Sequence, residues 1–457
     1  MLKLYDTAQG KIVEVIPRTP GKFSMYCCGP TVYDLPHIGH GRAMITWDFI
    51  RRYLEWTGLE VHHVANVTDV DDNIINRAAK LGLTPKAVAE RYEAEWWAAT
   101  DRLGARRPVD QPHASAYVER MVAVIAELID RRYAYDTNDT VYFSSSMVED
   151  YGLLARQTVE SLRSGARVDV DDEKRSPIDF ALWKKASGPH DLPQWPSPWG
   201  AGRPGWHTEC VVMSLDILGD GFDLHGGALD LMFPHHENER AQAVALGRSF
   251  SRHWVHHGFI EVGGEKMSKS LNNFTSLTDM LDRVDPRAYR LLVLRAHYRS
   301  PLDVTPELVA ESESALSRFD GLARRVGGAP TYAAGRGSAV SSPELIAFDE
   351  AMSNDLDTPA STAILFDLLR RANVALDAGA QALGEALAAT AFEVAGALGL
   401  FASVVDDAPD AASAALVGAL DAARAAKDFG RADAIRAQLQ ADGWVVEQTR
   451  EGTTVHR

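Results

Sequence analysis

The segment from residue 23 to residue 67 limits the possible folds more than any other part of the chain. Residues 23–28 form a strand-like run that stops at a Gly-Pro pair, which cannot continue a central strand. Residues 39–56 carry apolar side chains at helical spacing, and residues 61–67 form a second strand-like run. Strand, helix and strand within about forty-five residues predict a right-handed parallel unit, the building block of a doubly wound nucleotide-binding sheet.

Several side chains that suit ligand binding fall where these predicted strands end. Ligands of doubly wound sheets bind beyond the carboxyl ends of the strands. The residues placed there are Cys28, Thr31, His37 and Thr68. This edge of the sheet is therefore the predicted site.

The length of 457 residues allows roughly two to four domains, and 46% hydrophobic with 24% charged residues is an ordinary globular composition. Five prolines between residues 187 and 205 predict an irregular loop, and a Gly, Pro and Ser-rich stretch at 327–343 predicts a linker. We expect an α/β fold in which a doubly wound parallel sheet carries an inserted connective domain and is followed by a helical bundle and a small mixed domain. The expected bounds are 1–110 with 201–250 for the nucleotide-binding catalytic domain, 111–200 for the insertion, 251–312 for the region around Lys266, 313–405 for the bundle and 406–457 for the terminal domain.

The charge and hydropathy pattern excludes some classes of protein. A net charge of −16 argues against a chain that coats nucleic acid by bulk electrostatics, although residues 421–457 carry six basic and six acidic side chains and permit RNA contact. Residues 387–405 are Ala-rich and contain Glu393, which favours a packed bundle helix over a membrane span. The N-terminus lacks a basic patch followed by an apolar run, so a cytoplasmic location is expected.

Two short strings suit a nucleotide. His37-Ile-Gly39-His40 lies at the start of the first predicted helix, where backbone N–H groups and the helix dipole favour an anion and the glycine lets a phosphate approach. Lys266-Met-Ser268-Lys269-Ser offers positive charges and hydroxyl groups to a triphosphate. Taken singly, the first string also fits a pair of loop histidines without a ligand, and the second a solvated basic turn.

A third group of residues suits a metal ion. His235 and Glu239 stand four residues apart, on one face of a helix predicted to begin at Pro234. With the thiolates of Cys28 and Cys210 they form a plausible zinc shell. The alternative is an ordinary helix-surface pair with cysteines in the core, and spacing alone does not bring the two cysteines together. The three cysteines of the chain are too few for a disulfide framework.

The acidic run Asp69, Asp71 and Asp72 permits a magnesium cluster, but we favour its use as the cap of a helix beginning near Asn73, where carboxylates favour the dipole.

These strings together resemble a known family. The His-Ile-Gly-His and Lys-Met-Ser-Lys-Ser strings, in that order, resemble the paired nucleotide signatures of class I aminoacyl-tRNA synthetases. The resemblance to cysteinyl-tRNA synthetases extends end to end through MYCCGPTVYDLPHIGHGR (25–42), NVTDVDDNII (66–75), GARVDVDDEKRSPIDFALWK (165–184), WPSPWGAGRPGWHTEC (195–210), DLHGGALDLMFPHHENE (223–239), KMSKSLNN (266–273) and the terminal EGTTVHR.

The resemblance implies a cysteine–tRNA ligase that forms cysteinyl-adenylate from L-cysteine and ATP, with magnesium, and loads tRNA(Cys). It implies no editing domain, because a zinc-bound thiolate separates cysteine from serine. The residues it implies are Cys28, Cys210, His235 and Glu239 for zinc, Thr31, Thr68 and Trp206 around the cysteine, His37, Gly39 and His40 at the phosphates, Lys266, Ser268 and Lys269 at the pyrophosphate, and Gly227 and Asp230 at the adenosine. Cys27 has no matching role and is expected to be a buried strand residue.

Residues 310–457 are expected to read the anticodon, with Phe429 and Trp444 either stacking on bases or packing in the core. No membrane partner is expected, and the chain is expected to act as a monomer. One alternative is an amino-sugar ligase of the mycothiol pathway, which lacks such a C-terminal module. The other is a zinc-stabilised sensor of cysteine or ATP without catalysis.

Overall fold

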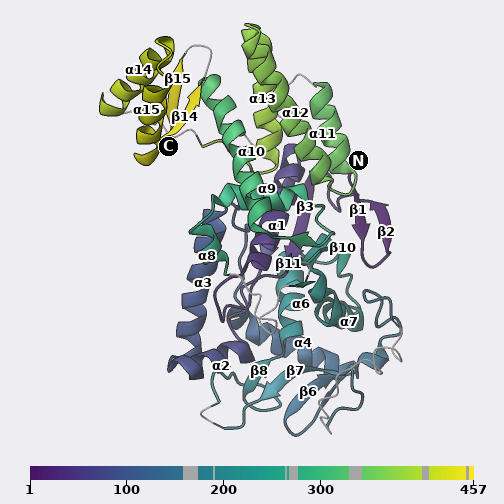
Figure 1. Cartoon of the computed structure of the whole chain (residues 1–457). Coiled ribbons are helices and arrows are strands. Elements are labelled where there is room, and N and C mark those ends of the chain that lie inside the picture. Colours follow the sequence, from purple (N-terminus) through teal and green to yellow (C-terminus); the bar gives the residue numbers. More distant parts are fainter. Residues whose placement is uncertain are drawn as a thin grey trace. The chain divides into compact units, whose positions relative to one another are not determined.

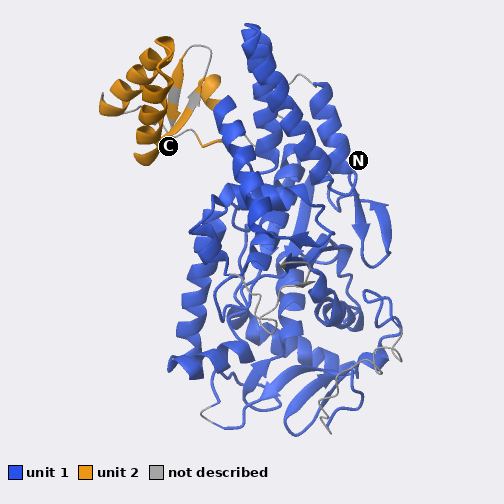
Figure 2. Cartoon of the chain, viewed as in Figure 1, with its two compact units in different colours: residues 1–322, 329–401 blue, residues 323–328, 402–457 orange. Residues whose placement is uncertain are grey.

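The computed structural model describes residues 1–157, 173–188, 191–262, 265–266, 276–328, 342–403, 411–448 and 452–456 (Figure 1). The chain divides into two compact units (Figure 2). The first unit contains residues 1–322 and 329–401, and the second contains residues 323–328 and 402–457.

A parallel sheet of four strands in the order β10-β9-β3-β4 forms the centre of the first unit. The strands are β3 (Lys22–Cys27), β4 (Glu60–Ala65), β9 (Phe222–Ala228) and β10 (Ser251–His257). Helix α1 (Ile38–Trp56) connects β3 to β4, so the predicted strand–helix–strand unit and the parallel fold class are confirmed. The chain leaves β3 toward β4 on one side, while β9 pairs on the other side, and this is the kind of switch point where such sheets bind ligands.

Helices accompany this sheet in two hydrophobic clusters: one packs Tyr26, Val64 and Phe222 of the strands against α6, and the other lies between α2 and α3. The helices are α2 (Asp72–Leu81), α3 (Pro85–Arg102), α4 (Val118–Asp130), α6 (Trp206–Ile217) and α7 (Glu237–Ala245). Asp71 caps α2, since its side chain accepts a hydrogen bond from the backbone N–H of Asn73, so the predicted capping role is confirmed for this residue. Asp72 instead pairs with Lys184 and Arg203.

A four-stranded antiparallel sheet in the order β5-β6-β7-β8 begins within the predicted insertion (111–200), and its last strand lies just beyond the predicted end. The strands are β5 (Ala134–Asp136), β6 (Thr140–Phe143), β7 (Phe180–Lys185) and β8 (Gly202–Pro204). Short 3-10 segments lie at Ala114–Tyr117 and Ser145–Met147, and another follows β9 of the parallel sheet at Leu229–Leu231. A separate core backs this sheet, with Phe143, Leu182 and Trp183 fully buried.

Smaller elements of the first unit accompany the parallel sheet. The N-terminal hairpin consists of β1 (Lys3–Asp6) and β2 (Lys11–Glu14). A three-stranded sheet of order β12-β11-β13 contains β11 (Ile260–Val262), β12 (Glu265–Lys266) and β13 (Leu302–Asp303), and helices α8 (Leu277–Leu281) and α9 (Pro286–Arg295) lie between β12 and β13 in the sequence.

Long helices follow: α10 (Pro306–Arg325), α11 (Pro343–Ser353), α12 (Thr358–Asp377) and α13 (Gln381–Ala397). Helices α11 and α13 are tied to α1 by side-chain hydrogen bonds, from Tyr53 Oη to Asp349 Oδ1 (2.9 Å) and from Trp56 Nε1 to Glu393 Oε1 (3.0 Å). These bonds join the bundle to the helix that carries the histidine string.

A buried charge cluster strengthens the same region. Asp48 on α1 is 2% exposed and accepts hydrogen bonds from Arg52 Nε at 2.8 Å and Arg290 Nη1 at 2.7 Å. Burial alone would raise the pKa of Asp48, but the two guanidinium groups hold it below its usual value.

The second unit contains α14 (Ala411–Ala425), α15 (Phe429–Ala441) and the antiparallel hairpin of β14 (Val445–Gln448) and β15 (Thr453–His456). Trp444 is 5% exposed and packs with Leu420 and Leu439, whereas Phe429 is 67% exposed. Of the two aromatic residues considered for base stacking, only Phe429 is therefore accessible. Across the described residues of both units, no helix has the length and apolar character needed to cross a membrane.

Candidate active site and metal centre

Four side chains from distant parts of the sequence meet beyond the carboxyl end of β3. Cys28 directly follows β3, Cys210 lies on α6, His235 lies in the turn just before α7, and Glu239 lies in the first turn of α7. The two sulfur atoms are 3.7 Å apart, Cys210 Sγ is 3.7 Å from His235 Nε2, and Cys28 Sγ is 3.5 Å from Glu239 Oε1. One donor atom from each residue lies within 4.8 Å of every other. The four residues expected to bind zinc thus come together.

The turn before α7 differs from the prediction. The helix was predicted to begin at Pro234, but regular α-helix begins at Glu237 after a π-helical turn over Met232–His236. Phe233 has extended backbone (φ −142, ψ 131), which interrupts the helical path. His235 Nε2 nevertheless lies 2.8 Å from Glu239 Oε1, as their spacing of four residues predicts.

The donor set fits a zinc ion. Two sulfurs, one imidazole nitrogen and one carboxylate oxygen are ligands that zinc accepts in proteins. Cys210, His235 and Glu239 are at most 1% exposed. Burial raises the pKa of the Cys28 thiol well above its usual value, whereas the pKa of Cys210 is lowered to about 6, because hydrogen bonding to Cys28 and the contact with His235 outweigh the effect of burial. Cys210 is therefore the first of the two thiols to lose its proton, and a metal that binds both sulfurs would displace the proton of Cys28.

A second donor set overlaps the first and was not predicted. Cys28, His225, His236 and Glu239 also place one donor atom each within 4.8 Å of one another. His225 Nε2 lies 2.5 Å from Glu239 Oε2, and His236 Nε2 lies 3.3 Å from Cys28 Sγ. The adjacent pair of histidines in the His-His-Glu-Asn-Glu string was the signal for His236, whereas His225 is an isolated histidine in a buried strand.

Hydrogen bonds continue from this second set away from the sulfur atoms. His236 Nδ1 lies 2.8 Å from His256 Nε2, and His256 Nδ1 lies 2.8 Å from Thr7 Oγ1. Burial lowers the pKa of His256 to about 3, so this imidazole is neutral at ordinary pH. These hydrogen bonds fix the orientation of the His236 and His256 rings.

Of the expected substrate residues, Trp206 contacts one of the four donors. Trp206 stacks on His235 with ring centres 3.9 Å apart and an interplanar angle of 18°. Thr31 and Thr68 face each other in an isolated parallel bridge. Trp206 therefore contacts a proposed metal ligand directly.

Thr68 contacts a carboxylate that sequence reasoning missed. Its Oγ1 donates a hydrogen bond to Glu209 Oε2 at 2.8 Å and accepts one from Asn66 Nδ2 at 3.1 Å. Glu209 is fully buried, and its Oε1 has no hydrogen-bond partner among the described residues. Burial raises the pKa of this carboxyl group well above its usual value. The only sequence signal for Glu209 was its position directly before Cys210.

The histidine string forms the N-terminus of α1, as predicted. His37 is the cap residue, its Nδ1 accepts from the His40 backbone N–H at 3.3 Å, and His40 Nδ1 accepts from the His37 backbone N–H at 3.2 Å. The two rings stack with centres 3.6 Å apart. Gly39 lies in the first turn between them. Both imidazoles are thus held at a helix N-terminus, a place that favours anions.

Three of the remaining predicted residues are described: Gly227 in β9, Asp230 just after β9, and Lys266 in β12. A Cβ atom on Gly227 would lie 2.6 Å from His236 Cε1, so packing of this histidine already requires glycine there. Asp230 is exposed in the short 3-10 segment after β9. Lys266 is the last residue of β12, and Ser268 and Lys269 lie outside the described residues.

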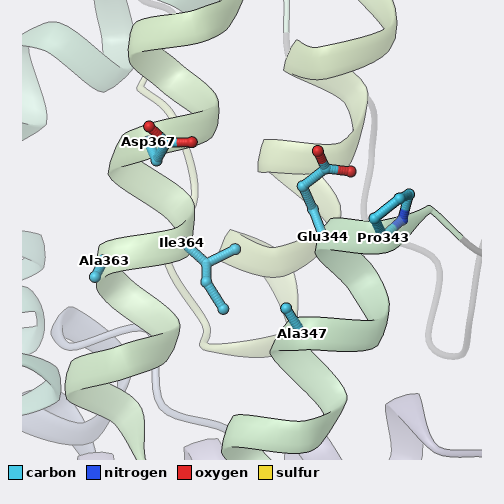
Figure 3. Close-up of a pocket in the computed structure, with 6 residues that line it drawn as sticks. All are labelled: Pro343, Glu344, Ala347, Ala363, Ile364 and Asp367. Atoms are coloured by element: carbon cyan, nitrogen blue, oxygen red, sulfur yellow. The ribbon is translucent and has the colours of Figure 1, made fainter.

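A surface groove of about 360 Å³ lies elsewhere, between α11 and α12 (Figure 3). Its lining residues are Pro343, Glu344, Ala347, Ala363, Ile364 and Asp367. Both carboxylates, Glu344 and Asp367, pair with Arg371. An apolar groove with an acidic rim does not suit phosphate, so this groove is separate from the nucleotide chemistry.

Comparison with known proteins identifies the family. The model described as the class I (C) tRNA synthetase catalytic domain matches residues 14–314, and the DALR domain model matches residues 347–402. The cysteine–tRNA ligase of Geotalea daltonii is 41% identical over 492 residues, covering 99% of both chains. That of Halorhodospira halophila is 42% identical over 467 residues, covering 100% of both.

Solved structures share the fold at low identity. Mycobacterium tuberculosis methionyl-tRNA synthetase in complex with methionyl-adenylate has a TM-score of 0.57 at 16% identity, over 82% of this chain and 89% of that chain. A putative arginyl-tRNA synthetase from Campylobacter jejuni has a TM-score of 0.54 at 12% identity, over 85% of this chain and 94% of that chain. The fold and the matching catalytic domain define a class I aminoacyl-tRNA synthetase. Within that class, the chain belongs to the cysteine–tRNA ligase family.

Proposed function

We propose that the chain activates L-cysteine with ATP to form cysteinyl-adenylate and then transfers the cysteinyl group to tRNA(Cys). The convergence of Cys28, Cys210, His235 and Glu239 at the carboxyl end of the parallel sheet carries this proposal. Full-length similarity to cysteine–tRNA ligases supports it, and because that similarity includes the C-terminal part, an amino-sugar ligase is not favoured.

Amino acid selection is proposed to depend on zinc held by these four residues. Zinc would lower the pKa of the substrate thiol and bind it as a thiolate, whereas the serine hydroxyl is a harder and far less acidic ligand. The indole of Trp206, stacked on His235, supports a role in closing the pocket around the substrate side chain. Thr31 and Thr68 are proposed to line the same pocket.

Adenylate formation requires no nucleophile from the protein. The cysteine carboxylate attacks the α-phosphate of ATP in line, a new C–O–P linkage forms, and pyrophosphate leaves with the bonding electrons of the broken P–O bond. His37 and His40 are proposed to hold the phosphates, with Gly39 allowing their approach to the helix N-terminus. Gly227 and Asp230 are proposed to lie along the adenosine.

The departing pyrophosphate gains charge during this step. Lys266, Ser268 and Lys269 are proposed to follow it, because lysine ammonium groups stabilise charge that develops on phosphate oxygens. Magnesium is proposed to bridge the same oxygens, since it is usually bound through substrate phosphates.

Transfer follows when a ribose hydroxyl of the terminal adenosine of the tRNA attacks the adenylate carbonyl and releases AMP. We propose that residues 313–405 and 406–457 contact the anticodon arm, with the exposed ring of Phe429 available for base stacking. The insertion at 111–200 and the region at 251–312 are proposed to border the acceptor end. The cytoplasm is proposed as the place of this reaction.

Two assays test this function on the full chain. Exchange of labelled pyrophosphate into ATP should depend on cysteine and should be far weaker with serine. Formation of cysteinyl-tRNA should then follow with tRNA(Cys), and no product should form with an amino-sugar acceptor. Cysteine-dependent exchange without tRNA charging would favour the amino-sugar ligase, and absence of exchange would favour the sensor.

A further inference from the structure

Arg42 on α1 is a fully buried cation whose contacts are backbone carbonyl groups. It is 1% exposed, and within the part of the chain that the structure describes its hydrogen-bond partners are carbonyl oxygens and not carboxylates. Its Nη1 donates to the carbonyl of Phe259 at 2.6 Å. Its Nη2 donates to the carbonyls of Ser300 at 2.5 Å, Tyr298 at 2.9 Å and His297 at 3.3 Å. Burying a guanidinium group without a counter-charge costs free energy, so a buried arginine with such partners suggests a specific role.

The acceptors lie at the base of the small sheet that carries Lys266. Phe259 directly precedes β11, and Ser300 lies two residues before β13. Strand β11 pairs with β13 on one side and with β12 on the other, where Glu261 faces Lys266. One side chain from α1 therefore holds the start of two of the three strands.

Close backbone packing at Gly258 supports this arrangement. A Cβ atom at that position would lie 2.5 Å from the carbonyl oxygen of Ser300. The Gly258 N–H donates to the carbonyl of Tyr298 at 2.8 Å. The chain between β10 and β11 therefore lies directly against residues 298–300, and Arg42 donates to both segments.

The next described residues after Lys266, from Ser276 onward, lie against the same end of α1. Ser276 forms an isolated bridge with His37, and the Leu277 N–H donates to the carbonyl of Pro36 at 2.9 Å. A Cβ atom on Gly41 would lie 2.9 Å from Leu277 Cδ1, so α1 and α8 are in close contact. The described residues on both sides of the lysine string are thus attached to the first turns of α1.

We propose that Arg42 is a positioning residue for adenylate formation: its bonds to four carbonyls set β11 and β12, and with them Lys266, relative to the turn that contains His37 and His40. This inference rests on the proposed function of those residues at the phosphates. Arg42 acts through the backbone that it holds, because its side chain is buried and its hydrogen bonds end on backbone carbonyl groups.

Arginine suits this task for a physical reason. Its planar guanidinium offers several donors in a fixed geometry, whereas a lysine ammonium cannot reach four carbonyls on two segments at once. Burial lowers the pKa of Arg42 to about 10, so the group remains charged at neutral pH. Carbonyl dipoles directed at it supply the compensation that a carboxylate would otherwise give.

Arg42→Lys tests the proposal on the full chain. We expect kcat of cysteine-dependent pyrophosphate exchange to fall about tenfold to a hundredfold, because a small displacement of phosphate-binding groups has effects of that size. KM for cysteine and the zinc content should stay at the parent values. Unchanged kcat, or a rise in KM for cysteine equal to the loss of kcat, would overturn the proposal.

Arg52→Lys is the matched control, since Arg52 is a second buried arginine on α1 that bonds to Asp48 and the carbonyl of Gly104. It should lose stability and keep the exchange rate at temperatures where the protein remains folded. Equal slowing in both variants would show a general effect of weakening α1 and would overturn the specific role of Arg42.

A double-mutant cycle with Lys266→Ala separates positioning from packing. If Arg42 acts by placing Lys266, Arg42→Lys should slow exchange much less when Lys266 is already absent. Fully additive losses would contradict the proposal. A parent enzyme without any exchange would refute the proposed function instead, so the two failures are distinguishable.

Discussion

Replacement of His225 by leucine tests which of the two overlapping donor sets holds the metal. His225 is fully buried, and its Nε2 lies 2.5 Å from Glu239 Oε2, while Glu239 Oε1 lies 3.5 Å from Cys28 Sγ and 2.8 Å from His235 Nε2. We expect zinc to bind on the Oε1 side, so that His225 orients the carboxylate without binding the ion.

The magnitude follows from this arrangement. Loss of a partner that orients a metal ligand typically weakens metal binding about 10-fold to 100-fold, or about 1.4 to 2.7 kcal/mol. Cys210→Ser removes a ligand itself and should cost more. Cys27→Ser is the matched control, because Cys27 is a buried thiol on β3 that belongs to neither donor set, and it should leave zinc affinity unchanged.

The assay is competition for zinc between the intact variants and a chelator of known affinity, with circular dichroism to verify folding. The predicted order of zinc affinity is Cys27→Ser, then His225→Leu, then Cys210→Ser. A larger loss for His225→Leu than for Cys210→Ser would place the ion in the set that contains His225 and His236, and would refute the assignment.

Three further changes test other parts of the structure. Thr68→Val removes the only donor to the buried Glu209 carboxylate among the described residues, so it should lower the free energy of unfolding by about 1 to 3 kcal/mol and raise KM for cysteine; unchanged values of both would remove Thr68 from the pocket. Asp48→Asn leaves the buried Arg290 without its counter-charge and should cost about 3 to 5 kcal/mol in urea unfolding at pH 7. Because the pKa of Asp48 is lowered in the folded state, its contribution is complete above the unfolded value of about 3.9 and should disappear as pH falls through the lower folded value; a difference that persists at still lower pH would contradict this. Phe429→Ala should weaken tRNA binding by about 1 kcal/mol or more while pyrophosphate exchange stays constant, and equal effects on both would exclude a stacking role.

The sequence allowed prediction of the parallel unit because its signals are local. Alternating strand and helix patterns from residue 23 to residue 67 depend on neighbours within one element, and the observed β3, α1 and β4 lie within a few residues of the predicted ranges. The predicted second strand reached residue 67, whereas β4 ends at Ala65, because the backbone beyond it bonds to loops such as Pro30 and Pro112.

The site depends on contacts that leave weaker patterns. Cys28 and Cys210 are 182 residues apart, and only the family resemblance linked them before their 3.7 Å contact was known. His225 lies in a buried strand with no ligand-like spacing, and Glu209 is adjacent to a ligand in sequence without a motif of its own. Arg42 bonds to carbonyl groups, which every residue has, so no sequence pattern could identify its partners.

Tertiary structure also determines two local features that the sequence did not predict: where α7 begins and which aromatic residue of the second unit is buried. Regular α7 begins at Glu237 rather than Pro234, because the turn Met232–His236 before it is irregular, with extended backbone at Phe233, yet the contact of His235 with Glu239 that the i, i+4 spacing predicts is kept. Trp444 is buried in the core of the second unit, while Phe429 is exposed. The sequence around the two aromatic residues does not show which of them is buried.

Zinc-edge X-ray absorption of the full-length protein, recorded with and without cysteine, is the most direct test of amino acid selection by the metal centre. Without cysteine, the spectrum should fit two sulfurs, one nitrogen and one oxygen, from Cys28, Cys210, His235 and Glu239. Addition of cysteine should raise the sulfur count to three, and addition of serine should leave it at two. A sulfur count that does not change with cysteine would contradict the proposal that zinc binds the substrate thiol.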